Sequence, residues 1–346
     1  MVKAAVLVGP RKIEIKEYQP LKDLPKDTIF ADVMMGGICG TDLHIYKGLV
    51  DVRYPIILGH EVLCVRDDER FVVLPGAPCG KCYYCRFLSS PCFNLCPNKR
   101  LIGFNNPEEP PHLLGGYSEA LYIHIDFPTF KIPDDVSDET AVLTDTLASV
   151  LGVQRAFMFN PEIETAVVQG SGPIGVLAAS ELKRRGVQHV IMIGTPENRL
   201  RLALNFGVDD TADLEELEQS EDRVDYVKDM TDSRGADLVV ECAGKTTAFK
   251  EGLDMVRPGG VYFEVGIGAD VGEVVINPYR QITFKNVTIL GQYGYTASLY
   301  SESIRLLSQG IYPYSSLVTH KFALEDTDDA IRALIDLKCM KAVLVP

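Results

Sequence analysis

The apolar residues near the start of the chain come in short runs with turns between them. The runs cover residues 4–8, 13–15 and 30–34, and Pro or Gly marks the turns. Residues 117–125 alternate apolar and polar positions after a pair of glycines. Short runs of this kind between turn residues are typical of strands. The first part of the chain is therefore predicted to be rich in β-structure.

A longer apolar pattern with helical spacing covers residues 138–159 and predicts a helix. Asp145 lies in the middle of its apolar face. Burying a carboxylate is costly unless the group is paired or bound to a metal ion. Asp145 is therefore a candidate metal ligand, and an ordinary position on the helix surface is the alternative.

The second half of the chain alternates short apolar runs with helical patterns. The predicted strands are residues 165–169, 190–193, 236–241, 260–266 and 286–291. Helices are predicted up to residue 185 and over 246–256, and the acidic residues 213–222 are expected to form a solvated helix face. Alternation of buried-type strands with helices indicates a doubly wound parallel sheet. Residues 298–310 are expected to begin a final segment of helix and strand, which ends in a strand at 343–345.

Length and composition narrow the class of protein. The chain has 346 residues, of which 46% are hydrophobic and 24% charged, with a net charge of -14. These values predict a globular protein of two domains and argue against a nucleic-acid partner, which needs a basic face. The longest apolar run, residues 166–180, is interrupted by Gly and Pro and is too short to span a bilayer. Without a recognisable secretory segment, we expect a soluble, cytoplasmic protein with no membrane partner.

Five of the nine cysteines lie close together between Cys79 and Cys96. An odd number of cysteines in a cytoplasmic chain favours metal ligation over a disulfide framework. Cys79, Cys82 and Cys85 recur at intervals of three, and four thiolates at such spacing form a closed, structural zinc site. Cys92 and Cys96 compete for the fourth position, and Cys96 is preferred because Cys92 lies in a stretch that resembles an inserted loop.

Two short motifs suggest a second metal centre. They are Cys39-Gly40-Thr41-Asp42-Leu43-His44 and Gly59-His60-Glu61. A Cys thiolate and a His imidazole are ligands that suit zinc, which makes Cys39 and His60 candidate ligands. Taken singly, each of these two residues is more often an ordinary core or surface side chain.

The neighbours of these two residues favour a reaction centre. Thr41 is a candidate proton carrier, His44 a candidate relay base and Asp42 a carboxylate that supports the metal site. Glu61 adds a further acid beside the candidate ligand His60.

A glycine-rich turn lies between the predicted strand 165–169 and the helix that follows it. It has the G-x-G-x-x-G pattern, with Gly170, Gly172, Pro173, Ile174 and Gly175 as candidate cofactor contacts. The glycines permit a tight turn and close approach to a pyrophosphate, which the helix N-terminus attracts. Because the pattern follows a strand and opens a helix, it indicates dinucleotide binding. A glycine-rich turn without a ligand is the alternative.

The residues after the second predicted strand of this region bear on the choice of cofactor. An NAD site normally has an acidic residue there, but this chain has Gly194 and Thr195, followed by Arg199. Room for a 2′-phosphate, with Thr195 and Arg199 as donors, favours NADP(H) over NAD(H). Glu197 argues for NAD(H). Gly266, at the end of a later predicted strand, is a further candidate cofactor contact.

With these motifs assembled, the chain resembles the zinc-containing medium-chain dehydrogenase/reductases, which include the alcohol, polyol and threonine dehydrogenases. The resemblance covers nearly the full length and includes the later Arg257-Pro258-Gly259-Gly260. It implies a GroES-like, β-rich catalytic domain at residues 1–151 and 292–346, with the zinc lobe at 79–96. A Rossmann dinucleotide-binding domain at 152–291 is inserted in it. The resemblance also implies a homodimer or homotetramer.

The resemblance assigns roles to individual residues. Cys39 and His60 match ligands of the catalytic zinc, and Asp145 takes the place of the third ligand, which is Cys or Glu in most relatives. Thr41 matches the hydroxyl that takes the substrate proton, and His44 the outer relay base. Asp42 matches the carboxylate that supports the metal site, and Glu61 the acid beside the metal. The chain departs from the family pattern at Asp145, in its short segment 62–73 and in the long interval from Cys85 to Cys96.

These roles imply oxidation of a secondary alcohol or a polyol, a small-molecule substrate, with hydride transfer to NAD(P). Zinc would favour the alkoxide, and the proton would leave through Thr41 towards His44. One alternative is a zinc-free quinone or enoyl reductase of the same superfamily. Another is a relative that binds NADP(H) without catalysing a reaction.

Overall fold

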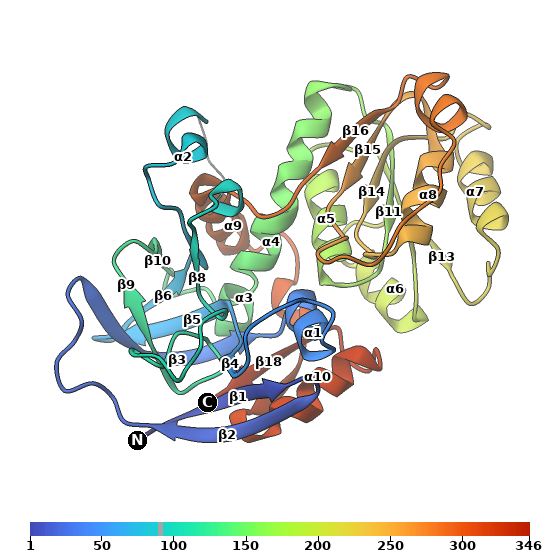
Figure 1. The fold of residues 1–346 in the computed structure, drawn as a ribbon. Coiled ribbons are helices and arrows are strands. Elements are labelled where there is room, and N and C mark those ends of the chain that lie inside the picture. Colours follow the sequence, from blue (N-terminus) through green and yellow to red (C-terminus); the bar gives the residue numbers. More distant parts are fainter. Residues whose placement is uncertain (89–92) are drawn as a thin grey trace. The chain divides into compact units, whose positions relative to one another are not determined.

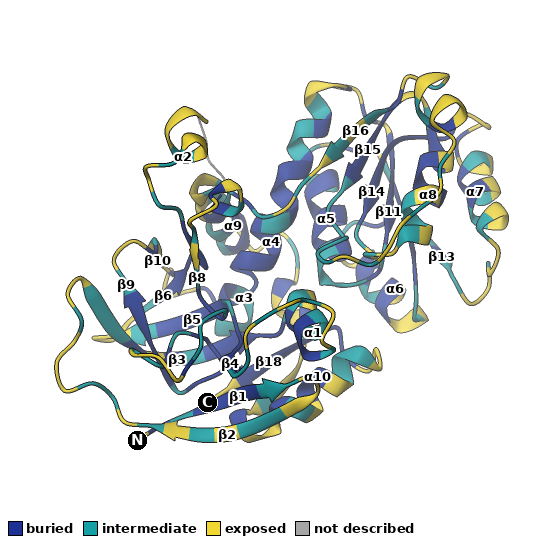
Figure 2. Ribbon diagram, viewed as in Figure 1, coloured by how far each residue is buried: buried dark blue, intermediate teal, exposed yellow. Residues whose placement is uncertain are grey.

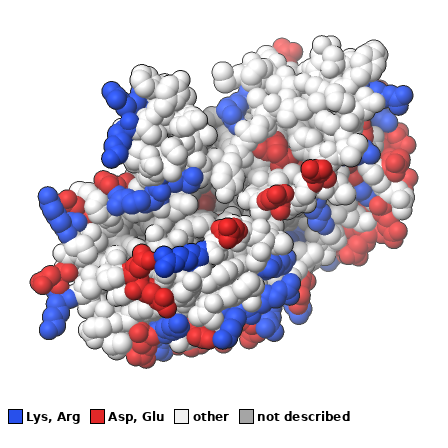
Figure 3. Space-filling view, viewed as in Figure 1, with Lys and Arg blue, Asp and Glu red and all other residues white. Residues whose placement is uncertain are grey.

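The computed structural model describes residues 1–88 and 93–346. Cys92, which the sequence leaves open as a zinc ligand, lies outside the described residues. On the face drawn in Figure 3, acidic and basic side chains are interspersed. Among the helices of the described part of the chain, none has both the length and the apolarity that crossing a membrane requires.

The first of two compact units comprises Met1–Asp145 and Gly294–Pro346. Its strands are β1 (Val2–Gly9), β2 (Lys12–Tyr18), β3 (Thr28–Gly37), β4 (Ile56–Ile57), β5 (Glu61–Arg66), β6 (Glu69–Val73), β7 (Gly76–Ala77), β8 (Arg100–Leu101), β9 (Ala120–His124), β10 (Thr129–Lys131), β17 (Val318–Ala323) and β18 (Lys341–Val345). A seven-stranded sheet has the order β10-β6-β5-β3-β18-β17, with β9 beside β3 (Figure 1). Strands β2-β1-β4 form a second sheet and β7-β8 a third. The predicted β-rich start is confirmed.

The last strand joins the two sequence segments of this unit. β18 pairs antiparallel with β3, where Val343 lies opposite Gly37 and Leu344 opposite Gly36. It pairs parallel with β17 on its other side. The strand predicted at residues 343–345 is therefore confirmed, and it begins two residues earlier, at Lys341. This pairing places β18, which begins at Lys341, between β3 and the edge strand β17 in a sheet formed mostly by the first 131 residues.

The helices of the first unit are short. They are α1 (Gly40–Tyr46), α2 (Tyr83–Phe87), α3 (Asp138–Ala141), α9 (Ala297–Ser308) and α10 (Thr327–Ile335), with 3-10 turns η1 (Phe93–Leu95), η4 (Tyr314–Leu317) and η5 (Leu324–Asp326). Helix α1 is anchored by Ile45 and Tyr46, which are buried in one core cluster with residues of β1, β4 and α10. Packing rather than length therefore holds α1 in place, since seven residues are too few for a stable isolated helix.

A tight hairpin explains the short segment that follows Glu61. Strands β5 and β6 pair antiparallel from Leu63 opposite Val72 to Arg66 opposite Glu69. Asp67 and Asp68 between them have φ angles of 50° and 62°. Two successive residues with positive φ fit the two-residue turn that matches strand twist, and Asp tolerates this conformation better than most residues.

The second compact unit, Thr146–Tyr293, is a doubly wound parallel sheet. Its strands are β11 (Thr165–Gln169), β12 (His189–Gly194), β13 (Asp210–Asp213), β14 (Ala236–Glu241), β15 (Val256–Glu264) and β16 (Thr288–Gly291). Its other elements include α5 (Pro173–Arg184), α6 (Glu197–Leu204), α7 (Ser220–Asp229), α8 (Thr246–Met255) and η3 (Tyr279–Thr283). All strands are parallel, in the order β13-β12-β11-β14-β15-β16. Its central strands are buried (Figure 2), which explains their almost continuous apolar runs.

The continuous helix predicted over residues 138–159 is wrong. Helix α3 ends at Ala141, α4 (Thr144–Leu151) follows it, and η2 (Gly152–Met158) is a 3-10 helix. The buried Thr144 hydroxyl donates to the Ala141 carbonyl at 2.7 Å. A side chain that takes a backbone carbonyl competes with the helical ladder, so the periodic apolar pattern spans a break.

The helix face predicted over residues 213–222 is also wrong for most of that range. Strand β13 ends at Asp213 and α7 begins at Ser220, with a turn between them. The Asp213 side chain accepts a hydrogen bond from the Glu215 backbone N–H at 3.0 Å. The Asp213 backbone carbonyl accepts one from the Leu217 N–H at 2.9 Å. An Asp that bonds to the backbone two residues ahead nucleates a turn instead of a helix.

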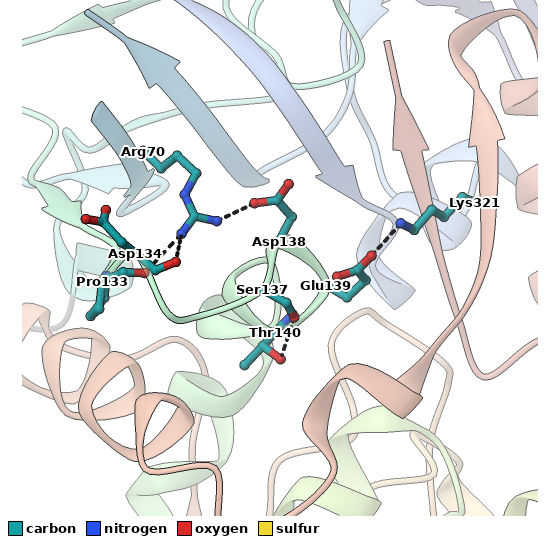
Figure 4. Close-up of polar contacts among 8 residues, drawn as sticks. All are labelled: Arg70, Pro133, Asp134, Ser137, Asp138, Glu139, Thr140 and Lys321. Atoms are coloured by element: carbon teal, nitrogen blue, oxygen red, sulfur yellow. Dashed lines mark hydrogen bonds and ion pairs between the residues drawn. The ribbon is translucent and has the colours of Figure 1, made fainter. Parts of the chain in front are cut away.

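Helix α3 is tied to the rest of its unit by polar contacts (Figure 4). The Arg70 guanidinium on β6 donates to Asp138 at 2.6 Å, and to the carbonyls of Pro133 and Asp134 at 3.0 and 3.2 Å. Lys321 on β17 forms an ion pair with Glu139. These contacts fix the start of the segment that leads to Asp145.

We expect the substitution Arg70→Met to lower the free energy of unfolding by about 2 kcal/mol, because hydrogen bonds to charged groups contribute about 1.5–3 kcal/mol. The matched control is Lys131→Met on the neighbouring strand, whose ion pair with Glu69 is exposed at both ends. Exposed pairs contribute less than about 1 kcal/mol. Urea unfolding of the two variants tests this, and equal losses would contradict the anchoring role of Arg70.

Candidate metal centre and cofactor site

Helix α1 begins at the proposed metal ligand Cys39, which is its N-terminal cap. The backbone N–H of Cys39 donates to Asp42 Oδ2 at 2.9 Å, and the Tyr117 hydroxyl donates to the same oxygen at 2.9 Å. Asp42 is buried. Burial alone would raise the pKa of Asp42, but His60 and these two donors lower it. Asp42 is therefore a buried carboxylate that fixes the backbone at Cys39.

The second candidate ligand, His60, lies in a turn that requires glycine before it. Gly59 has a φ of 93°, and a Cβ there would lie 2.5 Å from the Tyr117 ring. His60 Nδ1 lies 3.7 Å from Asp42 Oδ1, beyond hydrogen-bond distance. Among the described residues, this buried Nδ1 has no hydrogen-bond partner. Burial lowers the pKa of His60, but Asp42 and Cys39 together raise it well above its usual value.

Cys39, His60 and Glu61 present donor atoms that all lie within 4.8 Å of one another. Sulfur, imidazole nitrogen and carboxylate oxygen are the three donor types that zinc takes in proteins. The Asp42 carboxylate beside His60 Nδ1 is a partner that orients a metal-bound imidazole. The chemistry of the donor set therefore fits a zinc ion.

Glu61 is also held by a buried cation that the sequence analysis missed. The Lys341 ammonium pairs with the Glu61 carboxylate, and the two side chains are 3% and 1% exposed. Burial lowers the pKa of Lys341, but Glu61 and Cys39 raise it above its usual value. Gly37 makes the pairing possible, because a Cβ at that position would lie 2.2 Å from Glu61 Oε2. The only sequence signal for this role was a Lys at the start of a buried strand.

Asp145 is buried near these residues. It accepts a hydrogen bond from the Tyr295 hydroxyl, a partner that sequence spacing could not identify. Burial raises the pKa of Asp145 to about 6, with His60 lowering it and Glu61 raising it. The cluster of donor atoms within 4.8 Å comprises Cys39, His60 and Glu61, without Asp145. Asp145 as the third ligand stays a prediction.

Thr41 and His44 lie three residues apart on α1, and so on one side of that helix. The Thr41 hydroxyl lies 3.9 Å from Cys39 Sγ. His44 Nδ1 is buried and has no hydrogen-bond partner in the described part of the chain. Burial, with a smaller effect of Lys47, lowers the pKa of His44. His44 is therefore neutral at pH 7. The proton relay through these two residues stays a prediction.

Cys79, Cys82, Cys85 and Cys96 converge into a second cluster, with all sulfur atoms within 4.8 Å of one another. Cys82 Sγ lies 3.4 Å from Cys85 Sγ and 3.8 Å from Cys96 Sγ. The Lys81 backbone N–H, more than that of Cys82, lowers the pKa of Cys79 to about 6, although burial opposes this. The four converging sulfur atoms are the donor set that a tetrahedral four-sulfur site needs.

The glycine-rich turn lies between β11 and α5 in the second unit. Gly172 is the N-terminal cap of α5 and Pro173 its first residue, followed by Ile174. Gly170 has a φ of 108°, and a Cβ on Gly175 would lie 1.9 Å from the Gly170 carbonyl oxygen. The strand order reverses between β11 and β14, and open α/β sheets bind ligands at that point.

The loop after β12 is bonded to this turn. The Ser171 hydroxyl donates to the Thr195 carbonyl at 2.8 Å and accepts from the Thr195 N–H at 3.2 Å. A Cβ on Gly194 would lie 2.6 Å from the Ser171 side chain. The Thr195 hydroxyl donates to Glu215, an acid that the sequence analysis did not consider, at 3.2 Å. Arg199 lies in α6 and is largely buried.

Breaking the buried pair at Glu61 should be costly. We expect Lys341→Met to lower the free energy of unfolding by about 3–5 kcal/mol, because removing one partner leaves a buried charge uncompensated. Adding Glu61→Gln should recover much of this loss. Denaturant unfolding in the presence of a chelator measures both. The control Lys12→Met breaks an exposed pair with Glu14 and should cost less than about 1 kcal/mol. A Lys341→Met variant as stable as this control would contradict the assignment.

Two family models match the chain. The "Alcohol dehydrogenase GroES-like domain" matches residues 25–134, and the "Zinc-binding dehydrogenase" model matches residues 173–309. These matches agree with the predicted fold class, a GroES-like β-rich domain with a Rossmann domain.

Known proteins match over the full length. A sorbitol dehydrogenase from Bacillus subtilis is 31% identical, with 100% of this chain and 97% of that protein covered. The crystal structure of an alcohol dehydrogenase from Thermotoga maritima has a TM-score of 0.90 at 28% identity, covering 100% of this chain and 99% of the other. A Sinorhizobium meliloti protein described as a zinc-binding dehydrogenase, solved with NADP, has a TM-score of 0.85 at 25% identity, with 100% and 99% covered.

Proposed function

The chain belongs to the zinc-dependent medium-chain dehydrogenase family and is an oxidoreductase of the alcohol and polyol dehydrogenase type; we propose that it oxidises a secondary alcohol or a polyol with NAD(P). The observation that carries this proposal is the cluster of Cys39, His60 and Glu61, whose sulfur, nitrogen and oxygen donors lie within 4.8 Å of one another. A zinc-free quinone or enoyl reductase would need neither this cluster nor the four-cysteine cluster.

We propose that Cys39, His60 and Asp145 hold the catalytic zinc, with Glu61 as the acid beside it. Bound there, zinc would act as a Lewis acid that polarises the alcohol oxygen. Asp42 positions Cys39 through its backbone N–H and lies beside His60. Lys341 balances the negative charge of Glu61. The buried charges of this centre thus offset one another around the ligands.

We propose that Thr41 takes the proton of the alcohol and passes it towards His44. A hydroxyl both accepts and donates a hydrogen bond, which suits it to a relay. The lowered pKa of His44 keeps its imidazole neutral and able to accept a proton at pH 7. A bound dinucleotide would supply the nicotinamide that accepts the hydride from the alcohol carbon.

We propose that the dinucleotide binds at the glycine-rich turn, through Gly170, Gly172, Pro173, Ile174 and Gly175. Gly194, at the end of β12, and Gly266, after β15, are further proposed contacts in the same unit. Thr195 and Arg199 support a preference for NADP(H), as does the NADP found with the Sinorhizobium meliloti relative. Glu197, together with Glu215, which accepts the Thr195 hydroxyl, favours NAD(H).

Several further proposals concern the chain as a whole. We propose that Cys79, Cys82, Cys85 and Cys96 hold a structural zinc, because four thiolates leave no position open for substrate. We also propose a GroES-like catalytic domain at residues 1–151 with 292–346, a Rossmann domain at 152–291, and assembly as a homodimer or homotetramer. The edge position of β16 supports assembly, since an open edge strand can pair with a second copy.

Free thiols at all described cysteines are compatible with a cytoplasmic location.

The function is tested with Cys39→Ser in a panel of secondary alcohols, polyols, sugars and L-threonine with both cofactors. We expect the wild-type chain to reduce one of the cofactors with at least one substrate. The variant should lose more than about 100-fold in kcat/KM, since several kcal/mol of charge stabilisation disappear. Its zinc content should fall from two to one per chain, and its circular dichroism should be unchanged. Full turnover by a zinc-free protein would refute the proposal.

The relay is tested with His44→Ala. We expect kcat to fall about 100-fold with little change in KM, because general base catalysis contributes about 10²–10⁴-fold. His320→Ala on the exposed strand β17 is the control and should leave kcat unchanged. Steady-state kinetics between pH 6 and 10 measures both variants. An unchanged pH profile for His44→Ala would contradict the relay.

A further inference from the structure

Two glutamates stand side by side at the ends of neighbouring strands in the dinucleotide unit. Glu241 ends β14 and Glu264 ends β15, and the two residues are register partners in the parallel pair. Register partners point to the same face of a sheet, with strands about 4.8 Å apart. Glu241 is fully buried. Two carboxylates in this position would repel each other strongly if both were ionised.

Each of these glutamates shapes the loop that follows its own strand. Glu241 Oε1 accepts hydrogen bonds from the backbone N–H groups of Ala243 and Gly244, both at 2.8 Å. Glu264 Oε1 accepts from Gly266 at 3.1 Å and from Ile267 at 3.0 Å. The two carboxyl groups therefore hold two adjacent loops at the carboxyl edge of the sheet, where open α/β sheets bind their ligands.

The two loops also touch each other. Gly244 has a φ of 68°, and a Cβ there would lie 2.7 Å from the Gly266 carbonyl oxygen. A Cβ on Gly266 would lie 2.3 Å from Glu241 Oε2. Glu241 thus lies directly against Gly266, which is a proposed cofactor contact.

The second oxygen of Glu241 is buried and has no hydrogen-bond partner among the described residues. In that part of the chain, no Lys, Arg or His forms an ion pair with Glu241 or Glu264. The remaining titratable neighbours are Cys242 and Tyr262, whose hydroxyl donates to Glu264 Oε2 at 3.3 Å. Burial and the charge of Glu264 raise the pKa of Glu241 to about 8.

The helices that pack on this face bring no cation that is free to neutralise the pair. Glu251 of α8 is engaged by Arg223 of α7, with contacts of 2.5 to 3.1 Å. Gln169, the register partner of Glu241 on β11, donates to Glu251 at 3.3 Å. Lys245, at the start of α8, is exposed to solvent. A proton is therefore the charge that relieves the repulsion.

We propose that Glu241 and Glu264 share one proton and act as a positioning pair for the dinucleotide. In the protonated form, the Glu241 hydroxyl donates to the Glu264 carboxylate, and the loops at Gly244 and Gly266 are held together. Loss of the proton leaves two facing carboxylates, which push these loops apart and weaken cofactor binding. This inference rests on the proposed function, because it takes the cofactor to lie at Gly266.

The direction of the pH effect follows from the raised pKa of Glu241. The folded chain keeps this proton up to about pH 8, whereas an unfolded Glu loses it near its ordinary pKa of about 4.3. The folded chain thus binds more protons in this range, so the contribution of the pair to stability falls as the pH rises from about 4.3 to 8. Cofactor affinity should fall as the pH rises through the upper end of the same range.

The test measures binding of NADH and of NADPH to the zinc-loaded protein by fluorescence titration between pH 6 and 9.5. For the better cofactor, we expect the wild-type Kd to rise about tenfold, which corresponds to a one-unit difference in pKa between the free and bound forms. Glu241→Gln keeps the acceptor for Ala243 and Gly244 and gains a permanent donor, so its Kd should change less than about twofold over this range. Glu273→Gln, at an exposed carboxylate of the same unit, is the control and should follow the wild type.

A second readout separates this inference from the proposed function. Melting of the free protein between pH 5 and 8.5 does not involve the cofactor. The melting temperature should fall less in Glu241→Gln, and less in Glu264→Gln, than in the wild type and in Glu273→Gln. If neither NADH nor NADPH bound at any pH, the proposed function would be overturned. The melting curves would still test the shared proton. If Kd and melting temperature changed with pH equally in the wild type and in the glutamate variants, the proposal of a shared proton would be overturned.

Discussion

The burial of charge governs how the first unit is built. Glu61, Asp42, Asp145 and Lys341 are all desolvated, yet each is held by a specific partner. A buried charge without compensation costs several kcal/mol. The fold therefore has to bring the Lys of β18 to the Glu of β5, and the pairing of β18 with β3 does so. The candidate metal ligands lie around this neutralised core, where sulfur, nitrogen and oxygen donors converge.

Sequence reasoning identified most of the architecture because its signals were local. The buried-type strands, the turn from Gly170 to Gly175 and the doubly wound parallel sheet follow from apolar runs and glycine spacing. The helix over residues 138–159 was predicted as one element because periodicity records which face is buried. It does not record that the Thr144 hydroxyl takes a backbone carbonyl. The helix face predicted for the acidic residues after Asp213 is wrong for a similar reason. The Asp213 side chain accepts a hydrogen bond from the backbone of Glu215, and this bond stabilises a turn.

Some residues of the candidate site could likewise be identified from the sequence, and others could not. Cys39, His60 and Glu61 could be identified from residue type and short spacing, and the structure brings their donor atoms together. Tyr117, Tyr295 and Lys341 could not, because their roles depend on contacts across 75, 150 and 280 positions of sequence. Glycines were informative in a different way. Gly37 and Gly59 are needed where a side chain from another strand or a ring comes too close for any Cβ.

The separation of Glu61 from Lys341 has a consequence for how the chain matures during synthesis. The two residues are 280 positions apart, and at about 5–20 residues per second the ribosome needs on the order of 15–60 seconds to pass from one to the other. The parallel sheet from β11 to β16 is translated entirely within that interval. The Glu61 carboxylate of β5 is therefore synthesised long before Lys341, and the inserted unit already has all its strands by then. Completion of the seven-stranded sheet is consequently a late event, and a metal ion that reaches Cys39 and His60 earlier would meet Glu61 before Lys341 is synthesised.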